Sequence, residues 1–137
     1  MTGMRVAAEA RGMVGAPFRL QGRDPVSGLD CVGLAVVALG RAGHAVTPPE
    51  GYGLRMGDEM RARAWLAAAG LSEAEHVMPG DLMLVRSGLL QLHLMIAMPG
   101  AGFVHAHAGL RKVVEMPGPP LWPVIGLWRA SHNQSQI

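Results

Sequence analysis

The stretch Gly28-Leu-Asp-Cys-Val-Gly-Leu-Ala-Val-Val-Ala-Leu-Gly-Arg41 decides the fold of this chain. Asp30 is a strong helix N-cap residue, and Gly43 is a suitable stop two residues beyond the segment Cys31–Arg41. That segment is apolar around its whole circumference, which is typical of a helix enclosed on all sides. The sequence therefore predicts a buried central helix that begins at Cys31.

Elements of two different periods flank this helix. Residues 5–14 are rich in Ala and end before Gly15 and Pro17, and residues 58–69 have one apolar side, so both segments are predicted to be helices. After Gly70 short apolar segments alternate with turns, and strands are predicted at residues 82–86, 91–98, 103–107, 110–115 and 122–128. Helices followed by strands with short connections indicate an α+β domain with a mostly antiparallel sheet of about five strands.

Length and composition exclude several classes of protein. The 137 residues suffice for one domain, predicted at residues 1–130, followed by a flexible C-terminal tail at 131–137. Half of the residues are hydrophobic and 16% are charged, which excludes intrinsic disorder. A net charge of +2 without a Lys/Arg run argues against nucleic acid as a partner, and a single cysteine excludes an internal disulfide.

The sequence also lacks the usual targeting signals. It contains no apolar run of about 18 residues that would span a membrane. The first 16 residues show no long apolar segment followed by a cleavage site, so no signal peptide is visible. We therefore expect synthesis in the cytoplasm.

Cys31 is the first candidate for chemistry because it lies where the chain enters the central helix. The positive end of the helix dipole favours a thiolate at this position. Gly28 and Gly33 on either side allow a substrate backbone to approach closely, at some cost in helix propensity. The alternative is that a lone cysteine is a small residue of the core.

Three of the six histidines are candidate partners for this thiol. His93 interrupts an otherwise apolar strand, where an imidazole needs a partner to offset its desolvation. His105 and His107 are two residues apart on a predicted strand and therefore share one face. One interpretation is a Cys-His-His site in which His93 takes the thiol proton and His105 orients it; the other is a zinc site with one thiolate and up to three imidazoles.

Five short motifs, taken together and in this order, resemble the NlpC-type cell-wall cysteine peptidases, which are papain-like hydrolases of bacterial peptidoglycan. The resemblance covers residues 4–115 and rests on these segments: Gly15-Ala-Pro-Phe-Arg-Leu-Gln-Gly22, Asp30-Cys-Val-Gly33, Pro79-Gly-Asp-Leu82, His93-Leu-Met-Ile96 and Phe103-Val-His-Ala106.

The resemblance implies a papain-like fold and a set of roles. By position Cys31 is the nucleophile, His93 the general base and His105 the residue that orients the base. The implied reaction is hydrolysis of amide bonds in peptidoglycan stem peptides, of the γ-D-glutamyl–diamino acid type, with no cofactor and no metal. The resemblance also suggests a stripped single-domain form like the peptidases encoded with phage tails or gene-transfer particles, which implies tail or baseplate proteins as partners and delivery to the cell wall or periplasm.

Two positions depart from the family pattern. Phe18 replaces a tyrosine whose hydroxyl helps to bind the substrate or the oxyanion, and Val32 replaces a serine. Tyr52 is a possible substitute for the missing hydroxyl. Phe18, Asp30, Tyr52 and His107 are the further candidates for contact with the substrate or its oxyanion.

Two other functions remain open on the sequence. One is a catalytically weak or inactive module of the same fold that binds a tail or the cell wall, which the loss of the tyrosine at Phe18 favours. The other is an amidase or acyltransferase that acts on another small amide.

Overall fold

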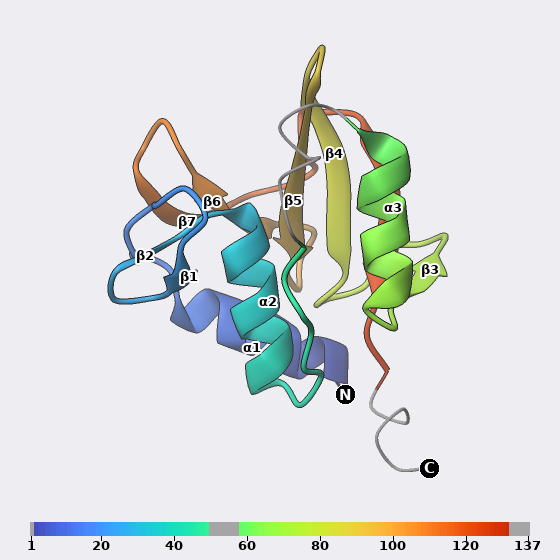
Figure 1. Ribbon diagram of the computed structural model, residues 1–137, viewed down its shortest axis with the longest axis horizontal. Coiled ribbons are helices and arrows are strands. Elements are labelled where there is room, and N and C mark those ends of the chain that lie inside the picture. Colours follow the sequence, from blue (N-terminus) through green and yellow to red (C-terminus); the bar gives the residue numbers. More distant parts are fainter. Residues whose placement is uncertain (1, 50–57, 132–137) are drawn as a thin grey trace.

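The computed structural model describes residues 2–49 and 58–131, and within these ranges the chain forms three helices and two antiparallel sheets (Figure 1). The helices are α1 (Thr2–Gly12), α2 (Cys31–Arg41) and α3 (Glu59–Ala68). A small ribbon consists of β1 (Arg23–Asp24) and β2 (Gly28–Leu29). The main sheet has the order β3-β8-β4-β5-β6-β7 and is built from β3 (Ser72–Ala74), β4 (Leu82–Gly88), β5 (Gln91–Ala97), β6 (Phe103–His107), β7 (Lys112–Met116) and β8 (Val124–Arg129).

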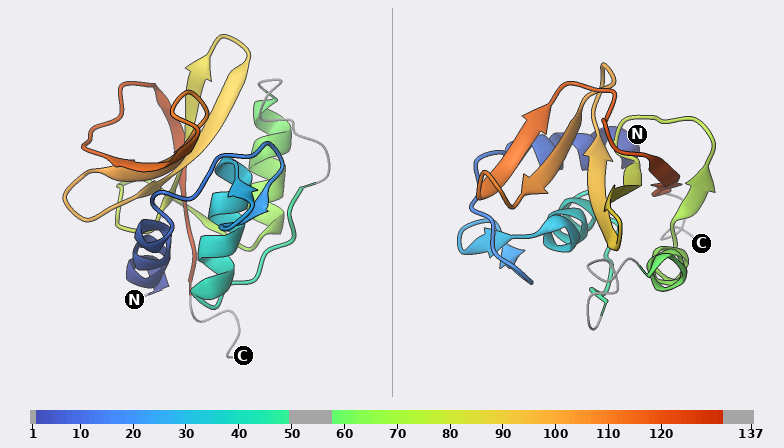
Figure 2. Two further views of the ribbon diagram at one scale, coloured as in Figure 1. Left: turned by 90° about the vertical axis from the view of Figure 1, so that its left-hand side faces the viewer. Right: turned by 90° about the horizontal axis from the view of Figure 1, so that it is seen from above.

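Helix α2 is the central helix that the sequence predicts. Asp30 caps it, because one carboxylate oxygen accepts the main-chain N–H of Gly33 at 2.9 Å. The other oxygen accepts the N–H of Gln21 at 2.8 Å, which holds the preceding loop against the start of the helix. The helix packs against α1, β5 and β6, and both α2 and α3 lie on one side of the main sheet (Figure 2).

The two faces of the sheet bury two separate sets of side chains. Leu84 and Leu94 point toward the helices and belong to the larger core. Met83 and Met95, each one residue away, belong to a second cluster with Phe103 on the opposite face. This alternation follows from the two-residue period of a strand, and it places His93 on the face away from the helices.

Strands β5 and β6 separate soon after they pair. Among the described residues their paired positions are Ile96 with Val104 and Ala97 with Phe103. Strand β6 continues to pair with β7 as far as His107 with Lys112. Only its pairing with β5 ends early. The N-terminal end of α2 lies at this opening, since Cys31 lines one pocket together with His93 of β5 and His105 of β6.

The predicted fold class, α+β with a mostly antiparallel sheet, is confirmed, but the number of strands is higher than about five. Strand β3 was not predicted because its three residues, Ser72, Glu73 and Ala74, are too few and too polar to show an apolar alternation. Of the predicted loose tail at 131–137, all but Ser131 lies outside the described residues. No helix in the described ranges is long and apolar enough to cross a membrane.

The Pro79-Gly80-Asp81 turn is held by an ion pair whose carboxylate is buried and whose guanidinium is partly exposed. Asp81 is fully buried, and its two oxygens accept hydrogen bonds from Nε and Nη2 of Arg129 at 2.8 and 2.9 Å. One of these oxygens also accepts the N–H of Met78 at 2.9 Å. The pair therefore joins the start of β4 to the end of β8, two segments far apart in the sequence.

We expect Asp81→Ala to lower the free energy of unfolding by about 2–3 kcal/mol, because the guanidinium of Arg129 and the N–H of Met78 lose a charged acceptor. Urea denaturation followed by tryptophan fluorescence measures the change. Glu115→Ala is the matched control, since it removes an ion pair with Arg11 that is exposed to solvent and is expected to contribute little. Equal losses in the two variants would contradict the structural role of Asp81.

Candidate active site

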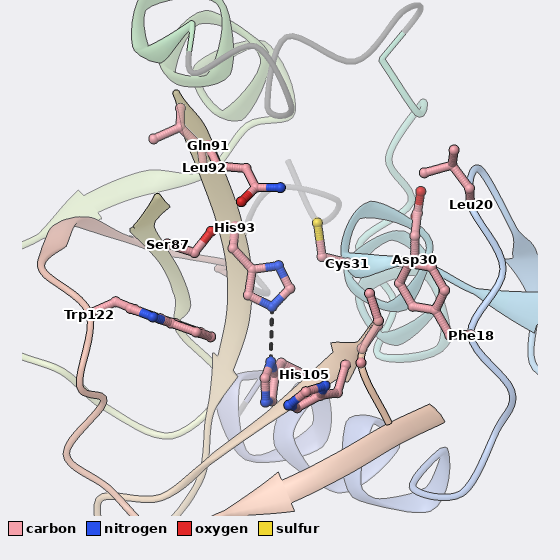
Figure 3. A pocket seen from close by; sticks show the side chains of 14 residues that line it. Phe18, Leu20, Asp30, Cys31, Ser87, Gln91, Leu92, His93, His105 and Trp122 are labelled. Carbon is pink, nitrogen blue, oxygen red and sulfur yellow. Dashed lines mark hydrogen bonds between the residues drawn. The ribbon is translucent and has the colours of Figure 1, made fainter. Parts of the chain in front are cut away.

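One pocket of about 420 Å³ contains most of the residues that the sequence singled out (Figure 3). The predicted residues that line it are Phe18, Asp30, Cys31, His93, His105 and His107. Tyr52, the remaining candidate, lies outside the described residues. The structure thus brings together side chains from the loop before α2, from α2 itself and from strands β5 and β6.

Cys31 is the first residue of α2, and its sulfur points across the pocket toward His93 (Figure 3). The main-chain N–H of Leu94, the residue after His93, and those of Val32 and Cys31 are close enough to the sulfur to lower the pKa of its thiol. The sulfur therefore lies between the start of the helix and strand β5. This contact is possible because β5 is not paired with β6 at this level.

His93 and His105 form a hydrogen-bonded pair. Nε2 of His93 lies 2.9 Å from Nδ1 of His105, and the rings meet edge to face with centroids 5.1 Å apart. The other nitrogen of His93, Nδ1, is on the side of Cys31 (Figure 3). When His93 accepts a proton at Nδ1, its Nε2–H donates to His105, which holds the imidazole in that orientation.

The arrangement also fixes where His105 carries its own proton. If Nδ1 of His105 accepts a hydrogen bond, the proton of this neutral ring is on Nε2. His105 is only 2% exposed, and its Nε2 has no hydrogen-bond partner among the described residues. The rings of Phe103 and Trp122 meet that of His105 edge to face at 5.3 and 6.1 Å, so the imidazole is enclosed by aromatic side chains.

Burial keeps the three groups uncharged. Desolvation raises the pKa of the Cys31 thiol to about 12, and the nearby charge of Asp30 adds to the rise. Burial lowers the pKa of His93 to about 3 and that of His105 to about 4, with further lowering by the neighbouring histidines. The main-chain N–H groups at the start of α2 lower the pKa of the thiol, in the direction expected from the helix dipole, but desolvation and Asp30 outweigh them.

The carboxylate of Asp30 is occupied by the chain itself. Besides capping α2 it accepts a hydrogen bond from Arg23 at 3.1 Å, and the residue is only 3% exposed. This side chain holds the loop that carries Phe18 beside the helix start. A contact between Asp30 and substrate stays a prediction, whereas its structural contacts are direct.

Several pocket residues were not predicted from the sequence. Ser87 and Gln91 come from β4 and β5, and Trp122 comes from the segment before β8. A Pro-rich segment gives no periodic signal for the position of its tryptophan, and no motif marks a serine or a glutamine in a hairpin. As for zinc, no group of three His, Cys, Asp or Glu side chains in the described ranges is arranged to hold a metal ion.

The fold is that of the NlpC/P60 domains, which are papain-like. NlpC2 of Trichomonas vaginalis superposes with a TM-score of 0.72 at 17% identity, over 93% of this chain and 46% of that one. NlpC1 of the same organism gives 0.70 at 19% identity, over 93% and 45%, so this chain spans less than half of either. The NlpC/P60 domain of the peptidoglycan hydrolase SagA gives 0.62 at 21% identity, over 94% and 98%.

The likeness in sequence is much weaker than the likeness in structure. No protein-family model matches the chain, and no curated protein has a sequence similar enough to match it. The superpositions confirm the fold that the five motifs suggest.

We expect the rate at which iodoacetamide labels Cys31 to rise about tenfold per pH unit up to at least pH 9, because only the thiolate reacts and the pKa of the thiol is raised to about 12. Mass spectrometry of the labelled protein gives the rate. Glutathione is the control, since its labelling levels off above an ordinary thiol pKa of about 8.5. A plateau between about pH 5 and 8 would instead reveal a thiolate–imidazolium pair and contradict this expectation.

The stability of the protein should fall as the pH is lowered from about 6.5 to 4. In the unfolded chain both histidines bind protons near pH 6.5, whereas folding lowers their pKa to about 3 for His93 and about 4 for His105. Protons therefore favour the unfolded state in this window. Urea denaturation at pH 7, 5.5 and 4.5 should show a weaker pH dependence for His105→Gln than for the parent protein, and an unchanged dependence would contradict the assignment.

Proposed function

We propose that the protein is a cysteine hydrolase of bacterial cell-wall peptidoglycan, with Cys31 as nucleophile, His93 as general base and His105 as the residue that orients the base. One observation carries the proposal: the sulfur at the start of α2 faces the free nitrogen of an imidazole whose second nitrogen is bonded to His105. This is the geometry of a nucleophile, a base and an orienting group in sequence.

Because Cys31 and His93 are both uncharged at rest, the first step must move the thiol proton to His93 as the sulfur attacks. The thiol proton of Cys31 passes to Nδ1 of His93 as the sulfur bonds to the carbonyl carbon of the scissile amide. The imidazolium formed in this step is stabilised through its Nε2–H by Nδ1 of His105. Because His105 is neutral, it acts as a hydrogen-bond acceptor and takes no charge from His93.

The remaining steps return the pair to its starting state. The main-chain N–H groups at the start of α2 are the donors for the oxyanion, since they already face the sulfur. The amide C–N bond then breaks, and the leaving amine takes the proton from His93. A water molecule gives its proton to His93 and attacks the thioester; the C–S bond then breaks, the acid is released, and His93 returns the proton to the sulfur of Cys31.

The choice of peptidoglycan rests on two kinds of support. The five motifs resemble the cell-wall peptidases, and SagA, one of the structures with the same fold, is described as a peptidoglycan hydrolase. Within this substrate we propose the stem peptide, at the bond between γ-D-glutamate and the diamino acid. The pocket is open and spans residues from both sides of the nucleophile, which suits an extended peptide.

A specific observation also favours the second candidate, a non-catalytic module with the same fold. A thiol pKa raised to about 12 is typical of an inert buried cysteine, and Phe18 at the pocket wall offers no hydroxyl. The hydrogen-bonded His93–His105 pair favours the hydrolase, since a binding module does not require an oriented imidazole beside a thiol.

We expect Cys31→Ala to lower the release of stem-peptide fragments from purified peptidoglycan at least about 10³-fold, because the reaction loses its nucleophile. His93→Ala should cause a loss of similar size. Liquid chromatography of the soluble products gives the rates.

His76→Asn is the matched control, since His76 is exposed and does not line the pocket. Fragment release that is the same in Cys31→Ala as in the parent protein would overturn the hydrolase and leave the binding module. Circular dichroism of each variant separates the loss of activity from the loss of fold.

A further inference from the structure

His107 lies beside the proposed catalytic pair but does not take part in it. It is the last residue of β6, two positions after His105, and the two rings have centroids 5.3 Å apart. Nδ1 of His105 is hydrogen-bonded to His93. His107 lines the pocket and is half-buried, so its ring belongs to the wall that a substrate would meet.

One nitrogen of His107 is used by the turn that follows. The main-chain N–H of Leu110 donates to Nδ1 of His107 at 3.1 Å. A ring nitrogen that accepts a hydrogen bond carries no proton, so the proton of the neutral ring is on Nε2. Gly109 leaves room for this arrangement, because a Cβ at position 109 would come within 3.0 Å of Cε1 of His107.

The other nitrogen is available. Among the described residues Nε2 of His107 has no hydrogen-bond partner in the protein. Unlike Nε2 of His105, it is not a buried atom without a partner, so it is accessible. The pocket wall therefore presents an N–H donor whose tautomer is fixed by the β6–β7 turn. Such a donor pairs with an oxygen, and a peptide carries such oxygens as carbonyl and carboxylate groups.

We propose that His107 binds the substrate, with its Nε2–H donating to a carbonyl or carboxylate oxygen of the peptide in the pocket. The proposal rests on the proposed function, because it assigns a contact to the same site. His107 contributes to affinity and takes no part in proton transfer, since its Nδ1 is held by Leu110 rather than by either member of the His93–His105 pair.

Two substitutions separate the substrate contact from the role in the turn. In His107→Asn the side-chain oxygen can replace Nδ1 as the acceptor for Leu110, but no group reaches the position of Nε2. In His107→Gln the amide nitrogen can reach that position, but the acceptor for Leu110 is lost. A purely structural role predicts that His107→Asn is the milder change, and substrate binding predicts the opposite.

The experiment measures binding of the synthetic tripeptide L-Ala-γ-D-Glu-meso-diaminopimelate by calorimetry to proteins that also carry Cys31→Ala, so that no turnover occurs. We expect His107→Asn to raise the Kd about tenfold, the loss of one hydrogen bond, and His107→Gln to stay within about threefold. His76→Asn should leave the Kd unchanged.

Equal Kd values in the Asn and Gln variants, a larger loss in the Gln variant, or no binding by the Cys31→Ala parent would overturn the role of His107. Rates with the intact Cys31 keep the two proposals distinct. If the parent protein cleaves nothing but the tripeptide still binds in a His107-dependent way, the hydrolase fails and the binding contact stands. If cleavage depends on Cys31 while His107→Asn leaves KM unchanged, the hydrolase stands and the contact fails.

Discussion

The early separation of β5 from β6 is the constraint on which the site depends. His93 lies on the sheet face that points away from the helices, whereas Cys31 belongs to a helix on the other side. The two strands pair at two positions among the described residues and then separate, so that the N–H of Leu94 is left unpaired by β6 and lies near the sulfur, where it lowers the pKa of the thiol. A fully paired sheet would occupy that N–H and place a continuous ladder between thiol and imidazole. The sequence of α2 places Cys31 at this separation: its apolar residues fill the core, and Asp30 caps the helix so that it begins at Cys31.

Burial gives the pocket its chemical character. It raises the pKa of Cys31 and lowers the pKa of His93, so the resting pair is neutral and becomes charged only when a proton moves between its members. In the proposed reaction, the hydrogen bond from His93 to His105 strengthens most when positive charge appears on His93. The low dielectric of the pocket makes the protein less stable in acid, where the unfolded chain binds protons at these histidines more readily. The same low dielectric strengthens polar contacts made inside the pocket.

Much of the fold could be predicted from the sequence, because its signals are local. The Asp30 cap and the apolar circumference of Cys31–Arg41 indicate a buried helix, and the alternation around His93 indicates a strand. Strand β3 could not be predicted, since its polar residues pair only through their backbone with β8. The net rise in the pKa of the Cys31 thiol could not be predicted, because the dipole of a helix is visible in the sequence while the desolvation of one sulfur depends on packing from other segments. The tautomer of His107 likewise depends on the turn at Leu110, which no motif describes.

The position of β8 has a consequence for synthesis on the ribosome. This strand is the last of the main sheet in the chain, yet it lies between β3 and β4, and its Arg129 completes the ion pair with Asp81. A nascent chain that ends before Val124 has no partner for one edge of β4, and one that ends before Arg129 leaves the buried carboxylate of Asp81 without its cation. We therefore expect the main sheet and the pocket, which includes Trp122, to be completed only after almost the whole domain has left the exit tunnel.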